Sequence, residues 1–371
     1  MPSNDSYRYI LKNSMGVVTC IWHKNGLFMS MLDENNKWGS PFLLSDSATP
    51  DFSALLNSDD VISACYVDYS DRLMFITACE EKNKPIVLLE SRISGSSPYN
   101  VNLIEADGFL HVFYIVSHNR RQLLTYQRID GAIYSMPEVQ GVIIRDAKNY
   151  AVCTDGSNIH LFFVTNVQNV NLLVHRKISD GKVSKPVTTP FPYPPAHRLQ
   201  AVVSKNGPVY VLASCEEGQE STIIFKFDPI LNKFVKNLEV YNATTGQGSD
   251  SLILVNNNPF VIRSLRTAFI ISMVKPDLSG IADESKVDLT GRDIPLKCKF
   301  QSNHKEDYNF KCDVTPMLFG NGLRFPFNIK TLASIKPKEK EESPEAMQER
   351  IRELESRIEF LENAIREILR P

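Results

Sequence analysis

The sequence lacks the short motifs that mark the commonest catalytic and cofactor sites. It contains no P-loop, no dinucleotide-binding fingerprint, no HExxH pair, no nucleophile elbow and no zinc-ligand spacing. These absences argue against nucleotide-dependent, metalloprotease and α/β-hydrolase chemistry. We therefore predict no cofactor and no metal site, and we lean against an enzyme without deciding the question.

Long hydrophobic runs are also missing. No apolar segment approaches the roughly 18 to 20 residues that a membrane helix needs, and residues 1–7 lack the basic and apolar regions of a signal peptide. A formal net charge of −2 gives no electrostatic reason to expect nucleic acid as a partner. We expect a cytoplasmic protein that binds neither membranes nor nucleic acid.

The seven cysteines are odd in number and include no CxxC pair, so they do not form a disulfide framework. The sequence predicts a hairpin in which residues 296–300 pair with residues 308–312, and this hairpin would bring Cys298 towards Cys312. We expect both thiols to stay reduced in a reducing compartment.

What the sequence does contain is a repeat. The segment 123–129 is followed by Asp130-Gly131, and a similar segment, 172–178, is followed by Asp180-Gly181. A period of about 40 to 50 residues in a strand-rich chain is typical of a β-propeller. The repeat therefore indicates the architecture and says little about a ligand.

Each repeat unit is predicted to contain four antiparallel strands. Asp107-Gly108 and Asp155-Gly156 lie between apolar runs and favour tight hairpin turns. The second strands are apolar on both faces, as expected for strands packed between neighbouring blades. His111 and His160 occupy equivalent places in these strands, and we favour a structural role for them over a metal site.

We predict an all-β fold, a six-bladed β-propeller of four-stranded antiparallel blades, and keep seven blades open. The propeller spans residues 1–330, with a closing segment over 291–330. Its units begin near residues 7, 51, 99, 148, 198 and 249.

Beyond the propeller, residues 331–343 form a charged linker and residues 344–371 a predicted coiled-coil helix. Ser343 and Pro344 supply the expected start of that helix. Apolar residues follow at alternating spacings of three and four, and their Ile and Leu pattern favours a parallel two-stranded coil, with a trimer or tetramer left open. The alternative is a helix folded back on the propeller. The predicted oligomerisation residues are Met347, Ile351, Leu354, Ile358, Leu361, Ile365 and Ile368.

Binding residues are expected on the loops at the mouth of the central channel. The proline-rich connection 190–195 is the most unusual of them, either as a stiff linker or as a recognition loop. The candidate binding residues are Trp22, His23, Tyr69, Asp71, His118, Arg120, Arg121, Tyr193, His197, Arg263 and Arg266. No catalytic residue is assigned.

The outer turns, such as 36–41, and the strands that begin Asp-Gly-x-x-His resemble the sialidase-like, Asp-box type of propeller over about residues 7 to 290. The Asp-box itself is absent. The resemblance implies a propeller fold, three arginines that bind a substrate carboxylate, and a Tyr–Glu pair, but we assign these roles to no residues of this sequence. Fold likeness alone does not transfer activity.

Three hypotheses about function follow. The first is a non-catalytic binding or scaffold protein that presents a propeller face to a protein or glycan and is multimerised by the coiled coil. The alternative is a glycoside hydrolase or lyase with a degenerate active site, which needs two carboxylates or a Tyr–Glu pair at the channel mouth. The third is a purely structural assembly subunit.

Overall fold

The structure is a computed structural model, and it describes residues 7–78, 84–90, 97–131, 133–144, 150–191, 197–205, 207–215, 221–241, 248–289, 294–320 and 322–335. These residues belong to one compact unit that ends at Ile335. The predicted coiled-coil helix over 344–371 and most of the predicted linker lie outside the described residues. The coiled coil therefore stays a prediction.

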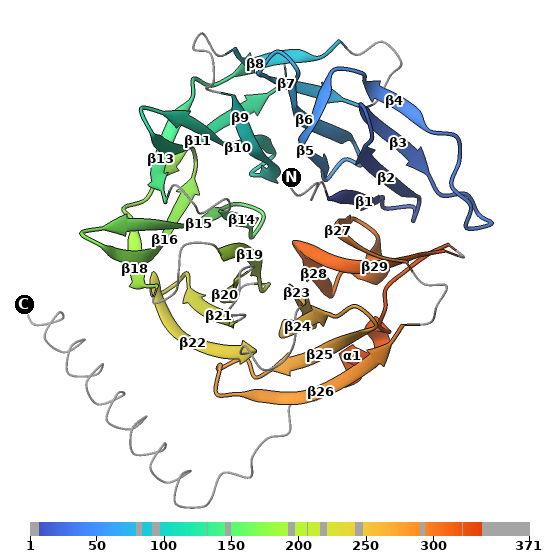
Figure 1. Ribbon diagram of the computed structural model, residues 1–371, viewed down its shortest axis with the longest axis vertical. Coiled ribbons are helices and arrows are strands. Elements are labelled where there is room, and N and C mark those ends of the chain that lie inside the picture. The colour runs from blue at the N-terminus through green and yellow to red at the C-terminus, as the bar shows by residue number, and fades with distance from the viewer. Residues whose placement is uncertain are drawn as a thin grey trace, which may run out of the picture. The chain divides into compact units, whose positions relative to one another are not determined.

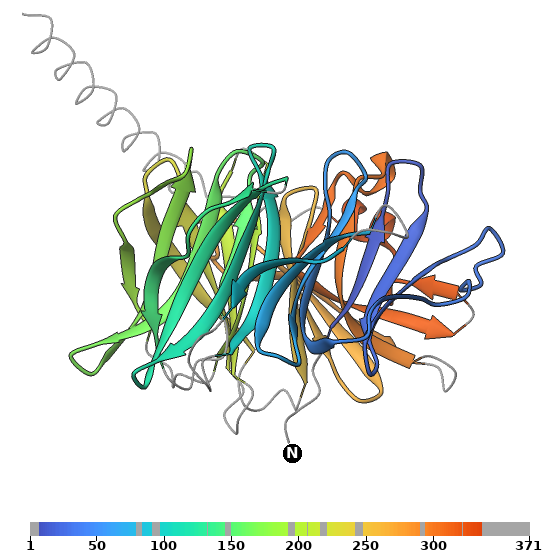
Figure 2. The ribbon, with the colours of Figure 1, turned by 90° about the horizontal axis from the view of Figure 1, so that it is seen from above.

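Antiparallel sheets stand around a central axis like the blades of a propeller (Figures 1 and 2), so the all-β prediction is confirmed. The first three blades contain β1 (Arg8–Lys12), β2 (Val18–His23), β3 (Leu27–Met31) and β4 (Phe42–Ser45); β5 (Ala48–Leu56), β6 (Ile62–Asp68), β7 (Arg72–Thr77) and β8 (Ile86–Glu90); and β9 (Pro98–Ala106), β10 (Phe109–His118), β11 (Arg121–Asp130), β12 (Ile133–Tyr134) and β13 (Glu138–Ile143).

The next three blades follow the same order from the channel outwards. They contain β14 (Ala151–Thr154), β15 (Ile159–Val167), β16 (Val170–Ser179), β17 (Lys182–Val183) and β18 (Val187–Pro190); β19 (His197–Val203), β20 (Val209–Cys215), β21 (Thr222–Asp228) and β22 (Lys233–Tyr241); and β23 (Ser249–Val255), β24 (Asn258–Ser264), β25 (Ala268–Val274) and β26 (Ile281–Asp288). The closing segment contains β27 (Ile294–Ser302), the 3-10 turn η2 (Lys305–Asp307), β28 (Phe310–Cys312), β29 (Val314–Gly320), β30 (Gly322–Arg324) and α1 (Ile329–Ser334).

The predicted turn chemistry explains the first hairpin of the third blade. Asp107 and Gly108 both have positive φ, 52° and 73°, between β9 and β10. A two-residue turn of this kind matches the twist of the strands it joins, and Asp and Gly tolerate that conformation. Turn residues of this kind allow the first hairpin of a blade to be predicted from the sequence.

The closing segment joins the two ends of the ring in a way that the sequence did not indicate. β27 pairs with β1 in parallel, Cys298 opposite Arg8, while β28 pairs with β23 of the sixth blade. β27 also pairs with β29, so that Cys298 lies opposite Thr315. The predicted hairpin between 296–300 and 308–312 is therefore wrong, because 310–312 fills the free channel edge of β23 instead. Cys298 and Cys312 are free thiols.

Among the described residues, the buried apolar side chains form seven clusters, one for each contact between neighbours in the ring. Five of these clusters lie between successive blades from the first to the sixth. A sixth cluster lies between the closing segment and the sixth blade, and a seventh lies between the closing segment and the first blade. In the last, Ile10 and Cys20 pack against Cys298 and Met317. The described strands form six sheets; β27, β29 and β30 extend the sheet of the first blade through β1, and they pack between the sixth blade and the first. Burial between blades is what holds such a ring together, at roughly 1.5 to 3 kcal/mol for each large apolar side chain.

The closing segment ends in a short helix that the sequence did not predict. The side chain of Asn328 accepts hydrogen bonds from the backbone N–H groups of Lys330 and Thr331 at the start of α1, and Leu332 is buried against the sixth blade. Six residues are too few to show helical periodicity. In the described ranges no helix has the length and apolar character needed to cross a membrane.

Candidate functional site

The inner strands surround a half-open cavity of about 310 Å³ in the central channel. One end of the channel, here called the first-turn mouth, lies beside the turns at 13–17, 57–61, 107–108 and 155–158. The other end, the opposite mouth, lies beside the turns at 24–26, 69–71 and 119–120. The cavity is lined by residues of β1, β5, β9, β14, β19, β27 and β28 and by Asp313, just beyond β28.

Lys299 of β27 reaches across this cavity. Its Nζ donates a hydrogen bond of 2.6 Å to Oδ1 of Asn102 on β9 and lies 3.3 Å from Oδ1 of Asp313. Burial, the largest single influence, lowers the pKa of Lys299, but Asp313, Tyr9 and Tyr7 together raise that pKa above its ordinary value. Lys299 and Asp313 therefore form an ion pair, and the separate hydrogen bond to Asn102 ties β27 to β9, a strand far from it in the ring.

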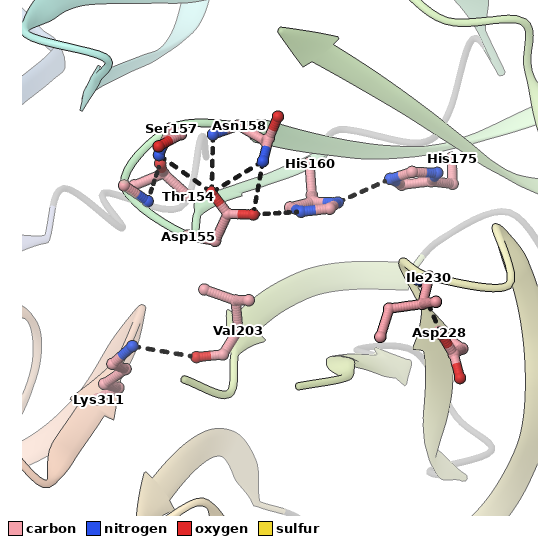
Figure 3. A network of polar contacts seen from close by, with 11 residues as sticks. Thr154, Asp155, Ser157, Asn158, His160, His175, Val203, Asp228, Ile230 and Lys311 are labelled. Atoms are coloured by element: carbon pink, nitrogen blue, oxygen red, sulfur yellow. Dashed lines mark hydrogen bonds and ion pairs between the residues drawn. The ribbon is translucent and has the colours of Figure 1, made fainter. Parts of the chain in front are cut away.

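Lys311 of β28 is the second lysine of the cavity, and it lies nearer the first-turn mouth, since it pairs with Leu254 close to the end of β23. Its Nζ points at the backbone oxygen of Val203 from a distance of 3.5 Å, the outer limit of a hydrogen bond (Figure 3). Burial lowers the pKa of Lys311. No carboxylate among the described residues makes an ion pair with it.

Two thiols also line the cavity, those of Cys153 and Cys312. Burial raises the pKa of both, so both stay protonated at neutral pH. A protonated, buried thiol is a poor nucleophile and a poor metal ligand. The part of the chain that the structure describes contains no group of three His, Cys, Asp or Glu side chains arranged to hold a metal ion.

The described residues that line the cavity do not include the acid–base pair of a glycosidase. Among the described lining residues Asp313 is the single carboxylate, and it faces Lys299. The lining tyrosine, Tyr9, donates to the backbone oxygen of Phe52, and burial raises its pKa. Hydrolysis of a glycosidic bond needs two carboxylates, or a nucleophile with a general acid, on either side of the bond.

The predicted binding residues lie on the strand ends and turns around the opposite mouth, on several different blades, and none that the structure describes lines the cavity. Trp22 stacks on Phe28, and His23 Nε2 lies 3.0 Å from the backbone oxygen of Ala48. Both therefore have packing partners within their own part of the ring. The described members of the predicted set therefore lie on one face of the propeller and do not line a common pocket.

Some of the other predicted binding residues have exposed side chains, and others lie outside the described residues. Tyr69 is 65% exposed, and His118 Nε2 contacts the side chain of Asn119. Tyr193 lies outside the described residues, as does the side chain of His197, although its backbone begins β19. The exposed members of the set are Tyr69, Asp71, His118, Arg120, Arg121 and Arg266.

The prediction that Arg263 binds a ligand is not supported, because its side chain is 1% exposed. Its Nε and one terminal nitrogen each donate to the Asp250 carboxylate at 2.9 Å, and that nitrogen also donates to the Thr222 hydroxyl at 3.1 Å. The guanidinium lies over the ring of Tyr241, 4.3 Å from its centre. Arg263 thus ties the fifth blade to the sixth. Sequence position alone placed it in a loop, whereas it is the next-to-last residue of β24.

A further contact crosses the channel near the opposite mouth. The guanidinium of Arg198, at the start of β19, lies 4.8 Å from the ring centre of Tyr7, just before β1. These strands are not neighbours in the ring, so the two side chains meet across its axis. A cation over an aromatic face stabilises such a bridge by roughly 0.5 to 2 kcal/mol.

The equivalent histidines have structural partners, as expected. His111 Nδ1 lies 2.9 Å from the Tyr126 hydroxyl, and His160 Nδ1 lies 3.1 Å from His175 Nε2. Asp155 approaches the other nitrogen of His160 at 3.5 Å, so the three side chains form a row (Figure 3). The row ends at the ring of Phe227, 3.8 Å from that of His175 between centres, and no hydroxyl or thiol completes a catalytic relay among the residues described there.

Sequence reasoning missed the cavity residues Lys299, Lys311 and Asp313. Their segment does not follow the repeat, and this departure was the one available signal. It could not show that β28 would leave β27 and lie in the channel beside β23.

No family model and no curated protein matches this sequence. Solved structures match the fold. The WD40 domain of Toxoplasma gondii coronin superposes with a TM-score of 0.51 at 8% identity, covering 87% of this chain and 80% of that one. A putative 6-phosphogluconolactonase from Bacteroides uniformis gives 0.51 at 13% identity, covering 76% and 85%. Aleuria aurantia lectin with α-methyl-L-fucoside gives 0.50 at 9% identity, covering 75% and 92%.

These likenesses show a β-propeller and, at such low identity, the fold alone. The assignment of this propeller to the sialidase-like type therefore stays a prediction.

Proposed function

We propose that this chain is a non-catalytic binding or scaffold protein whose propeller binds a protein or glycan partner. The observation that carries the proposal is the makeup of the channel cavity. It combines apolar walls with a few polar groups, as binding sites commonly do, while its one carboxylate among the described lining residues is engaged by Lys299.

The exposed side chains around the opposite mouth suit a partner larger than the cavity. Tyr69 is aromatic and largely exposed, and Arg120 and Arg121 of the third blade are exposed cations. Aromatic and arginine side chains are enriched where proteins bind partners. A partner docked on this face would contact several blades at once.

The coiled coil would raise the strength of such binding. Two propellers joined by residues 344–371 would bind a partner with repeated epitopes more tightly than one, since the second contact forms at a high effective concentration. This part of the proposal depends on the heptad pattern alone.

The oligomeric state is tested by light scattering on the full chain and on a chain truncated after Ile335, where the compact unit ends. We expect a folded monomer after truncation and a dimer or higher oligomer before it. A full-length monomer would contradict the avidity argument.

Binding is tested by capture on immobilised panels of glycans and proteins, with the full chain and the truncated chain side by side. We expect saturable capture by both, with slower dissociation of the full chain. A glycoside hydrolase or lyase remains the second candidate, but no described contact favours it. Cleavage of a captured glycan would replace our proposal with that candidate.

A further inference from the structure

One cationic group of the channel, that of Lys311, makes no ion pair with a described residue, and we propose that it is the anchor of a ligand site. We infer that the cavity binds a small anion, a carboxylate or phosphate group on a compact molecule, through the Nζ of Lys311. The inference rests on the proposed binding function and names the chemical class of the ligand.

The charges of the described lining residues do not balance. Three of these residues are charged: Lys299 and Asp313 pair with each other, and Lys311 is left. An ammonium group has three N–H donors, and among the described residues the Val203 oxygen, at 3.5 Å, is the single acceptor within hydrogen-bond distance of the Lys311 Nζ. Its remaining donors have room for a ligand, because Lys311 lines the cavity.

The described groups near Lys311 do not provide it with a counterion. Asp155 is the nearby carboxylate, but it accepts hydrogen bonds from the backbone N–H groups of Ser157 and Asn158, at 3.0 and 2.7 Å, and faces His160 (Figure 3). The Asp155 carboxylate therefore already has hydrogen-bond donors within its own turn. The Cys153 thiol is protonated, and the hydroxyl of Tyr308 accepts a hydrogen bond from Lys205.

The pKa of Lys311 agrees with this account. Burial lowers it, and Lys205 lowers it further, while Tyr308, Cys153 and Asp155 act in the opposite direction without restoring its ordinary value. An ammonium that loses solvation without gaining a counterion is destabilised, and an anion bound beside it would reverse that loss.

The size of the cavity limits the ligand. About 310 Å³ lies at the lower end of the range for small-molecule pockets. Thr154, whose hydroxyl oxygen accepts the N–H of Gly156, lines the same cavity and keeps its own hydrogen for a ligand oxygen. Ile104 and Phe310 add apolar wall. A single anionic group on a body of monosaccharide size suits these dimensions and polar groups.

The probes for the test are D-glucuronate, D-glucose and inorganic phosphate, titrated calorimetrically into the full-length protein at constant ionic strength. Glucuronate and glucose differ at the carboxylate, so their comparison isolates the charge. We expect saturable binding of glucuronate, of phosphate or of both, and none of glucose. Phosphate alone would assign a phosphoryl ligand and glucuronate alone a carboxylate.

Lys311→Met keeps the length of the side chain and removes its charge. We expect it to weaken anion binding about 10-fold or more, as loss of a charge-assisted hydrogen bond does, while Lys311→Arg retains most of the affinity. Lys182→Met, at an exposed lysine of β17, is the matched control and should bind as the unaltered protein does. Near-ultraviolet circular dichroism verifies that each variant is folded.

The inference is overturned if neither anion binds saturably, if glucose binds as tightly as glucuronate, or if folded Lys311→Met retains full affinity. None of these results depends on oligomeric state or on turnover. Failure of the anion site is thus separable from failure of the proposed function.

Discussion

Acidification should destabilise this protein through the buried histidine pair of the fourth blade. The pKa of His175 is lowered to about 3, first by burial and then by the neighbouring His160, against about 6.5 in an unfolded chain. The unfolded chain therefore binds more protons below pH 6.5. The free energy of unfolding therefore does not depend on the titration of His175 above pH 6.5. It decreases as the pH falls from 6.5 towards 3.

The expected loss follows from these two values. Between pH 7.5 and pH 5, His175 alone should lower the free energy of unfolding by about 2 kcal/mol, from linkage at 1.36 kcal/mol per pKa unit. Burial also lowers the pKa of His160 and of His111, so both add to the loss with the same sign. The measurement is urea unfolding, followed by tryptophan fluorescence, at the two pH values.

His175→Phe tests the assignment. Phe162 and Phe227 already surround the ring, so phenylalanine fits the chemistry of the site, although His160 loses a hydrogen-bond partner. The variant should be less stable at pH 7.5 but should lose about 2 kcal/mol less on acidification. His118→Gln, at an exposed ring, serves as control. An equal loss in His175→Phe and in the unaltered protein would refute the reasoning.

Two further substitutions test the packing between strands. Arg263→Leu should lower the free energy of unfolding by about 3 to 5 kcal/mol, because it leaves a buried carboxylate unpaired, whereas Arg266→Ala at an exposed site should change it little in the same denaturant titration. Gly141→Ala should cost about 1 to 3 kcal/mol, since a Cβ there would lie 2.5 Å from the Phe163 ring, while Gly39→Ala, with its nearest neighbour at 3.4 Å, should be nearly neutral by thermal unfolding.

The sequence could predict features that recur within one unit. Turns such as Asp107-Gly108 depend on residues adjacent in the chain, and the equivalence of His111 and His160 is visible as a repeat. Both were predicted, because local backbone preferences and strand packing act the same way in each blade.

Features that depend on distant segments were out of reach. Lys299 meets Asn102 across 197 positions of sequence, and the strand that carries Lys299 pairs in parallel with β1 at the other end of the chain. Arg263 was assigned to a loop because a strand end and a turn look alike in sequence, yet its place one residue before the end of β24 decides whether it binds a ligand or Asp250. The channel site is assembled by ring closure, which no local pattern encodes.

We propose that the propeller binds its ligand without transforming it. The most direct measurement incubates the full chain with each glycan that it captures, releases the ligand and compares its mass with that of the starting material. We predict saturable binding and quantitative recovery of intact ligand after many dissociation times. Recovery of shortened or unsaturated products, in amounts that grow with protein concentration, would contradict the account.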